Sequence, residues 1–134
     1  GALQETATTL RFFGPTLDPN EVTALLQGEP TAGVAAGGTW LTSLGREKTA
    51  KEGSWRLETV RREPGDLDGQ IAELLDQLTS DLGVWVDLTS RYRADIFCGL
   101  FLVEHNEGIS ISSETALKIG QRGLKLDLDI YVRD

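Results

Sequence analysis

Asp127 and Asp129 are the residues whose type and spacing come closest to a catalytic or metal-binding pair. They alternate with leucine and isoleucine in the stretch LKLDLDIYV, and this period of two is typical of a strand with one buried face. Side chains two residues apart on a strand point the same way, so the two carboxylates would lie about 7 Å apart. That spacing permits a site for a hard cation or an acid–base pair. Asp95, on a neighbouring predicted strand, would add a third carboxylate.

The same alternation also has a structural interpretation. Asp127 and Asp129 then lie on the solvated side of an edge or one-sided strand, interleaved with Lys125 and Arg133. We favour this interpretation, so we predict no catalytic residues and no metal ligands. Asp95, Asp127 and Asp129 are the candidates for the alternative function, a small metal-dependent hydrolase that uses an acidic cluster on the sheet face.

The single histidine and the single cysteine offer little further chemistry. Glu104 or Glu107 could orient His105 as a general base, but the loop EHNEG is typical of an exposed turn. Cys98 lies within an apolar strand, where a buried thiol has a raised pKa and is inert. One histidine and one cysteine exclude a multi-histidine or cysteine-based metal centre. We expect no cofactor.

Aromatic and basic residues gather in and after a long connection at residues 29–53. Residues 46–63 contain six basic and four acidic side chains in a chain of net charge −8. Tryptophan and arginine dominate interface hot spots, and long loops in compact domains are functional or mobile. The binding candidates are Trp40, Arg46, Lys48, Trp55 and Arg56, with Lys51, Arg61 and Arg62 nearby. In the alternative interpretation Trp55 belongs to the core and the cations are solvated.

Four strands and three helices must position these residues. We expect strands at residues 6–13, 54–60, 94–103 and 124–132, and a short strand within TWLTSL. Because both faces of the strand at 94–103 are apolar except for Asp95, we expect this strand to be central in the sheet or covered on both sides. Helices are expected at about residues 18–28, 67–82 and 113–122. The segment VWVDLTS that follows the second helix could be a short strand or a helical extension, and we favour a connection that packs Val84 and Trp85 on the core.

The first helix has the clearest local signals. Asp18 suits the N-cap, Pro19 the first helical position, and Glu21 the third, where it can complete a capping box. Gly28 is placed for a left-handed residue at the end of the helix. Capping explains the acidic start, so no catalytic role is needed there.

The order β-α-β-α-β-α-β predicts an α+β fold. We expect a two-layer sandwich in which three helices lie against one face of a mixed or mainly antiparallel sheet of four to five strands. A chain of 134 residues is typical of a single domain, residues 1–134, and the Gly-rich, basic loop at residues 29–53 lies within it.

Composition narrows the classes of partner. A net charge of −8 argues against a nucleic acid, because phosphate binding needs a clustered positive field. No apolar run approaches the roughly 18 residues that span a bilayer, so we expect no membrane partner. The start GALQ has neither the basic nor the apolar part of a targeting signal. We therefore expect a cytoplasmic location, and another protein as the partner.

Several stretches together resemble a known family. They are LDPNEVTALLQGEPT after the opening strand, the tryptophan strand GSWRLET, the amphipathic IAELLDQL, and the ending ISISSETALKIGQRGLKLDLDIYV. Over nearly the whole chain this pattern resembles the bacterial family called domain of unknown function 4279. The matching motifs are caps, core positions and turns, so the resemblance implies no catalytic residue. We expect a small bacterial protein that acts as a non-catalytic binding or protein-interaction module. A toxin-neutralising role, suggested only by the small, acidic character, is a weaker hypothesis.

Overall fold

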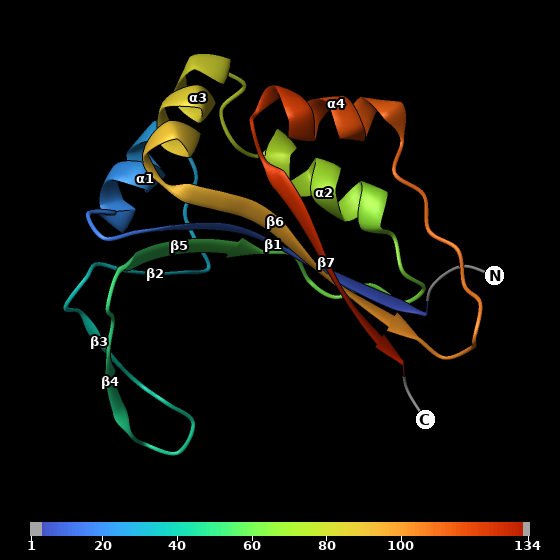
Figure 1. Cartoon of the computed structure of the whole chain (residues 1–134), viewed down its shortest axis with the longest axis horizontal. Helices are drawn as coiled ribbons and strands as arrows, with labels where there is room; N and C mark the ends of the chain where they lie inside the picture. The colour runs from blue at the N-terminus through green and yellow to red at the C-terminus, as the bar shows by residue number, and fades with distance from the viewer. Residues whose placement is uncertain (1–3, 133–134) are drawn as a thin grey trace.

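A computed structural model describes residues 4–132 of the chain (Figure 1). The first three residues, on which the targeting prediction partly rests, and Arg133 lie outside the described residues. The helices are α1 (Pro19–Leu26), α2 (Leu67–Asp76), α3 (Leu82–Arg91) and α4 (Ser113–Gln121). The strands are β1 (Glu5–Gly14), β2 (Ala32–Val34), β3 (Thr39–Leu41), β4 (Glu47–Thr49), β5 (Gly53–Glu58), β6 (Arg93–Leu102) and β7 (Lys125–Val132).

Between residues 4 and 132 the strands form a five-stranded main sheet and a separate two-stranded sheet. The main sheet has the order β2-β5-β1-β6-β7, and the β3–β4 hairpin forms the second sheet. β1 runs antiparallel to β5 and to β6, whereas β6 and β7 are parallel and α4 connects them. The sheet is therefore mixed, and β6 lies in its interior, as its two apolar faces predict.

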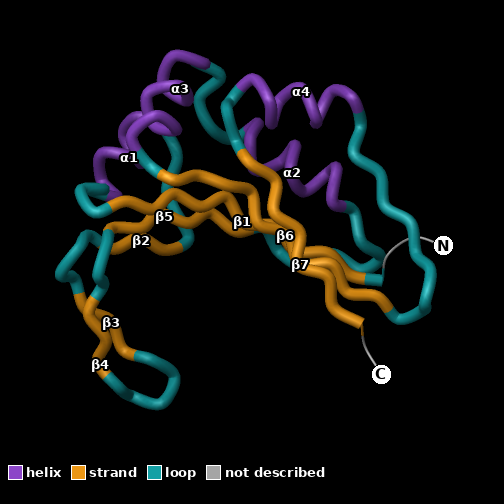
Figure 2. Tube along the Cα trace, viewed as in Figure 1, coloured by secondary structure: helices purple, strands orange, loops and turns teal. Residues whose placement is uncertain are grey.

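The described helices lie on one face of the main sheet, which confirms the α+β class (Figure 2). The β3–β4 hairpin projects from the β2 end of the sheet toward the opposite side (Figure 1). The core lies between the sheet and the helices. At its centre Phe12 of β1 packs against Trp55 and Trp85, with ring centroids 5.9 Å and 6.2 Å apart.

The prediction of three helices is wrong, because residues 4–132 contain four. The helix expected over 67–82 ends at Asp76, and α3 begins at Leu82, in the segment expected to be a connection. Leu78 closes a turn by donating its N–H to the carbonyl of Leu75. The Asp81 carboxylate then caps α3 by accepting from the N–H of Gly83. The spacing of the leucines masked this break, although Trp85 does pack in the core as expected.

The first helix confirms its predicted start but not its predicted end. Asp18 is the N-cap and Pro19 the first helical residue. The left-handed residue is Gln27, with φ 61°, rather than Gly28. A Cβ at Gly28 would meet the Leu78 side chain at 2.4 Å, so this glycine allows a close approach.

Three short strands lie within residues 29–53, which were predicted to be mostly loop. β2 pairs with β5 and becomes one edge of the main sheet. β3 falls within the predicted TWLTSL strand, and β4 returns beside it with Trp40 opposite Lys48. Two hydrogen bonds continue the hairpin toward its base, from Gly37 N to Ala50 O and from Ala50 N to Gly38 O.

Candidate binding surface

The face of the main sheet that lies opposite the helices is called the open face below. Alternation on β1 sends Leu10 and Phe12 into the core, and it sends Arg11 and Phe13 to the open face. The strand register then decides which residues meet. Arg11 lies between Arg56 of β5 and Asp95 of β6.

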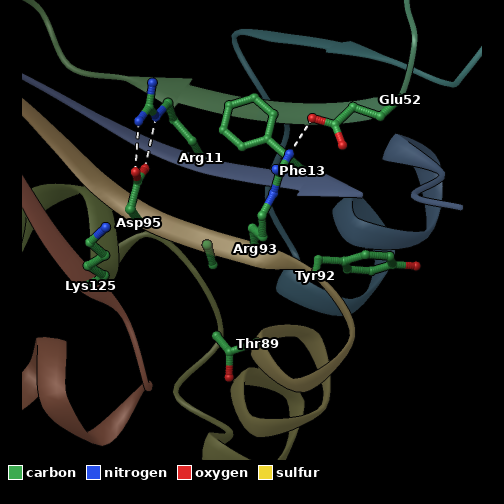
Figure 3. A pocket seen from close by; sticks show the side chains of 9 residues that line it. Arg11, Phe13, Glu52, Thr89, Tyr92, Arg93, Asp95 and Lys125 are labelled. Atoms are coloured by element: carbon green, nitrogen blue, oxygen red, sulfur yellow. Dashed lines mark hydrogen bonds and ion pairs between the residues drawn. The ribbon is translucent and has the colours of Figure 1, made fainter. Parts of the chain in front are cut away.

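Arg11 and Asp95 form a two-pronged ion pair on the open face (Figure 3). Arg11 Nε donates to Asp95 Oδ1 over 2.8 Å, and Arg11 Nη2 donates to Oδ2 over 2.7 Å. Burial would raise the pKa of the Asp95 carboxyl, but the hydrogen bonds and the charge of Arg11 outweigh burial and keep this pKa below its usual value. The hydrogen bond to Asp95 likewise raises the pKa of Arg11. Both groups therefore stay charged at neutral pH.

Guanidinium groups cover the phenylalanines of the open face. The Arg11 guanidinium lies 4.4 Å from the ring centroid of Phe97 and 5.3 Å from that of Phe13. Arg56 and Arg93 lie 5.5 Å and 5.7 Å from the centroid of Phe13. These distances fit cation–π contacts. The aromatic rings of this face are therefore shielded by flexible cations and not by a packed helix.

A hollow of about 640 Å³ opens at the end of the sheet where β7 begins later than β6. Arg11, Phe13, Asp95 and Lys125 line it, together with Arg93, which pairs with Glu52. Figure 3 shows that the two ion pairs are already formed across this hollow. Its charges are thus largely satisfied within the protein.

A second hollow of about 360 Å³ lies between the hairpin and the main sheet and is called the hairpin hollow below. Val34, Trp40, Ser54 and Arg56 line it with three neighbouring residues. Two predicted binding residues, Trp40 of β3 and Arg56 of β5, thus line the same hollow. Trp40 remains 46% exposed, so its indole is available to a partner.

The hairpin carries two more of the predicted binding residues, Arg46 and Lys48. The turn closes through hydrogen bonds from Gly45 N to Thr42 O and from Thr42 N to Arg46 O, with Gly45 at φ 78°. Glycine is the favoured residue at this left-handed position of a three-residue hairpin loop. Arg46 therefore lies in the turn and Lys48 opposite Trp40. Both are exposed, but neither lines the hairpin hollow.

Trp55, another predicted binding residue, lies in the core. Its side chain is fully buried on the helix side of β5, and its indole N–H donates to Thr23 Oγ1 over 3.0 Å. The alternative interpretation, a core tryptophan, describes its position. The alternation of β5 explains this, because it sends Trp55 inward and Arg56 outward.

The three candidate aspartates share the open face, and two of them, Asp95 and Asp127, interact with each other. All three also have partners of other kinds. Asp95 pairs with Arg11, Asp127 lies 3.4 Å from Lys125, and Asp129 accepts a hydrogen bond from Tyr131. Among residues 4–132 no group of three or more histidine, cysteine, aspartate or glutamate side chains could hold a metal ion. The candidate carboxylates are therefore engaged by side chains of the protein itself.

His105 and Cys98 lie apart from both hollows. His105 is exposed in the loop after β6, where the Glu107 carboxylate accepts a hydrogen bond from the Val103 N–H. Cys98 is buried on the helix side of β6, and burial raises the pKa of its thiol to about 12. A thiol of this kind is not a nucleophile at neutral pH.

Sequence reasoning missed the arginine–phenylalanine arrangement of the open face. The alternation of β1 puts Arg11 and Phe13 on one face. Their contacts with Phe97 and Asp95, however, depend on the register between strands more than 80 residues apart. An alternating strand with arginine and phenylalanine on its non-core face was the available signal.

Fold and surface together define a two-layer α+β domain with one face of its mixed sheet free of the described helices. Residues 4–133 match the family described as "Domain of unknown function (DUF4279)", so the protein belongs to this family. No curated protein and no solved structure matches the chain. None of the helices within residues 4–132 has both the length and the apolar character needed to cross a membrane.

Proposed function

We propose that the protein is a non-catalytic module that binds another protein through the hairpin hollow and the adjoining open face. The position of Trp40 carries this proposal. The hairpin holds this half-exposed indole beside Arg56, at the border between the hairpin and the sheet. A large aromatic side chain kept partly in water, with an arginine in the same hollow, has the composition of an interface hot spot.

The hairpin itself supports a role in binding. Each of its strands has three residues, and a two-stranded ribbon of this size is marginally stable in water. It nevertheless carries Leu41 and Leu44, both strongly exposed, in addition to Trp40. Contact with a partner would remove these side chains from water and stabilise the hairpin.

The charges of the open face favour a protein over a nucleic acid. Arg11, Arg56 and Arg93 share this region with Asp95 and Glu52, and two of the three arginines are paired with these carboxylates. Phosphate backbones need uncompensated positive charge. A surface of mixed charge with aromatic rings suits the side chains of a protein.

Affinity capture with a matched pair of variants tests the proposal. The first variant is Trp40→Ala with Arg56→Glu. The control is Val86→Ala with Gln121→Glu, which changes an exposed apolar and an exposed polar residue on the helix layer. We expect wild type and control to retain a protein that the first variant loses. When that protein is purified, calorimetry should show that it binds wild type and control but not the first variant. Retention of every partner by the first variant at unchanged affinity would overturn the proposal, as would loss of the bound material on nuclease treatment.

A further inference from the structure

The strand β7 forms the edge of the main sheet that lies farthest from the hairpin hollow. Among the described residues, β6 is the only strand that pairs with it. Every second N–H and C=O group of β7 therefore points away from the sheet. A row of such groups is a template on which an extended segment of another chain can add as a further strand.

One row of β7 side chains is apolar and unusually exposed. Leu128, Ile130 and Val132 point to the helix side of the sheet, yet they are 48%, 58% and 67% exposed. Figure 1 shows the reason, because β7 runs away from the helix layer toward its C-terminal end. The apolar row thus lies beside the free edge, where an added strand would cover it.

The other row of β7 is acidic along its middle. Asp127 and Asp129 point to the open face, and Tyr131 follows them. The Tyr131 hydroxyl donates to Asp129, and its ring stacks on Phe101 with centroids 5.1 Å apart. Lys125 approaches Asp127, but its side chain is 74% exposed. An exposed ion pair of this kind contributes little energy. Asp127 also interacts with Asp95, and a cation from a partner would offset the repulsion between these two carboxylates.

A second copy of β7 is a poor occupant of this edge. In an antiparallel pair within one continuous sheet, residues of the same row face each other. When two copies of β7 pair with Leu128 opposite its own copy, Asp127 of each copy lies opposite Asp129 of the other. The register that centres on Asp129 places this carboxylate opposite its own copy. The two longest registers therefore both oppose like charges, which destabilises a strand pair.

We infer that β7 binds an extended segment of a partner protein in which lysine or arginine alternates with aliphatic residues. Its cations would face Asp127 and Asp129, and its aliphatic side chains would cover Leu128 and Ile130. Backbone hydrogen bonds supply affinity in this mode, and the two rows supply specificity. This edge and the hairpin hollow lie at opposite ends of the strand order, and the variants below test them separately.

A set of three synthetic peptides, each as long as β7, tests the inference. The first alternates lysine with valine, the second glutamate with valine, and the third lysine with serine. Amide hydrogen exchange of the intact protein reports where each peptide binds. We expect the lysine–valine peptide to slow exchange in β7, and we expect about tenfold weaker binding of the other two. Unchanged exchange in β7 with the lysine–valine peptide, or equal binding of the glutamate–valine peptide, would overturn the inference.

Charge variants then show whether the lysine–valine peptide is attracted by Asp127 and Asp129 or by the net negative charge of the whole protein. Asp127→Lys with Asp129→Lys should reverse the preference toward the glutamate–valine peptide. Should that variant unfold, Asp127→Asn with Asp129→Asn keeps the size of the side chains and should remove the discrimination between the two peptides. Trp40→Ala with Arg56→Glu should leave peptide binding unchanged. If the asparagine variant still prefers the lysine–valine peptide as strongly as wild type does, Asp127 and Asp129 do not select the peptide and the inference is overturned. It is overturned as well if the wild-type protein forms a dimer that protects the β7 amides from exchange.

Discussion

Phe12 and Phe13 are neighbours in sequence, but they lie on opposite faces of the main sheet and are shielded in different ways. Phe12 is fully buried between Trp55 and Trp85. Phe13 is covered by the guanidinium groups of three arginines, which remain partly in water. A packed core stabilises the folded state because it removes apolar surface from water and fills the interior with close contacts between side chains. A layer of arginines shields its rings less completely, and its long side chains can move aside for a partner.

Phe12→Ala should have the largest effect, because the core face cannot refill the volume of the ring. We expect a loss of about 3–5 kcal/mol in the free energy of unfolding. Denaturant titration followed by circular dichroism measures it. Phe13→Ala is the matched control, and its loss should be clearly smaller. Equal losses at the two positions would show that the open face is packed like a core.

Asp95→Asn tests the main ion pair of the open face. We expect a loss of about 1–2 kcal/mol at neutral pH, since a charged hydrogen-bond acceptor is removed from Arg11. The pKa of Asp95 is lowered in the folded protein. Its stabilisation is therefore complete above its unfolded pKa of about 3.9 and is lost as the pH falls through the lower folded value.

Melting curves of wild type and Asp95→Asn across pH check this sign. The two melting temperatures should differ at pH 7 and converge below about pH 4. Glu52→Gln, which changes the carboxylate paired with the strongly exposed Arg93, serves as the comparison and should show a smaller difference. A constant gap at all pH values would mean that the charge of Asp95 does not stabilise the fold.

Phe13→Leu isolates the contact between ring and cation. Leucine keeps most of the apolar surface but lacks the negative face of the ring, so we expect a loss of about 0.5–1 kcal/mol. Repeating the change in an Arg56→Gln background should give a smaller loss, and the double-mutant cycle measures the coupling. Zero coupling would mean that Arg56 covers Phe13 only as an apolar lid.

Trp40→Ala should have the smallest effect on stability, within about 0.5 kcal/mol, because the indole is half exposed and lies outside the core. Thermal melting measures it. Trp55→Ala is the matched control, for which we expect the large loss of a buried aromatic residue. A large loss for Trp40→Ala would assign this residue a structural role and weaken the proposed binding function.

Much of the fold could be predicted because its signals are local. Asp18 and Pro19 mark the start of α1, and alternation in β7 and β6 reveals both strands and the interior place of β6. The break between α2 and α3 was missed because Leu78 and Leu82 continue the helical spacing of the leucines before them. Only Leu78 is buried. Whether a leucine is buried depends on which other elements pack against it, and the spacing of residues within one helix carries no information about those elements.

The candidate site was harder to predict than the fold. Composition selected Trp40 and Arg56, which share a hollow, but it also selected Trp55, which is a core residue. Both tryptophans follow a glycine-containing stretch and lie near basic residues, so composition cannot separate them. The sheet separates them, because Trp55 belongs to a strand covered by helices and Trp40 to a hairpin that projects from the domain (Figure 1).

The sequence by itself determined the class of the fold, the helix caps and the face to which each strand residue points. These properties follow from φ/ψ preferences, capping and the period of two, all of which act over a few residues. Only the tertiary structure decided that Arg11 meets Asp95 and Phe97, that Trp40 and Arg56 line one hollow, and that β7 has a free edge. Those contacts join residues far apart in the chain. Strand order and register, which set them, result from the packing of the whole core.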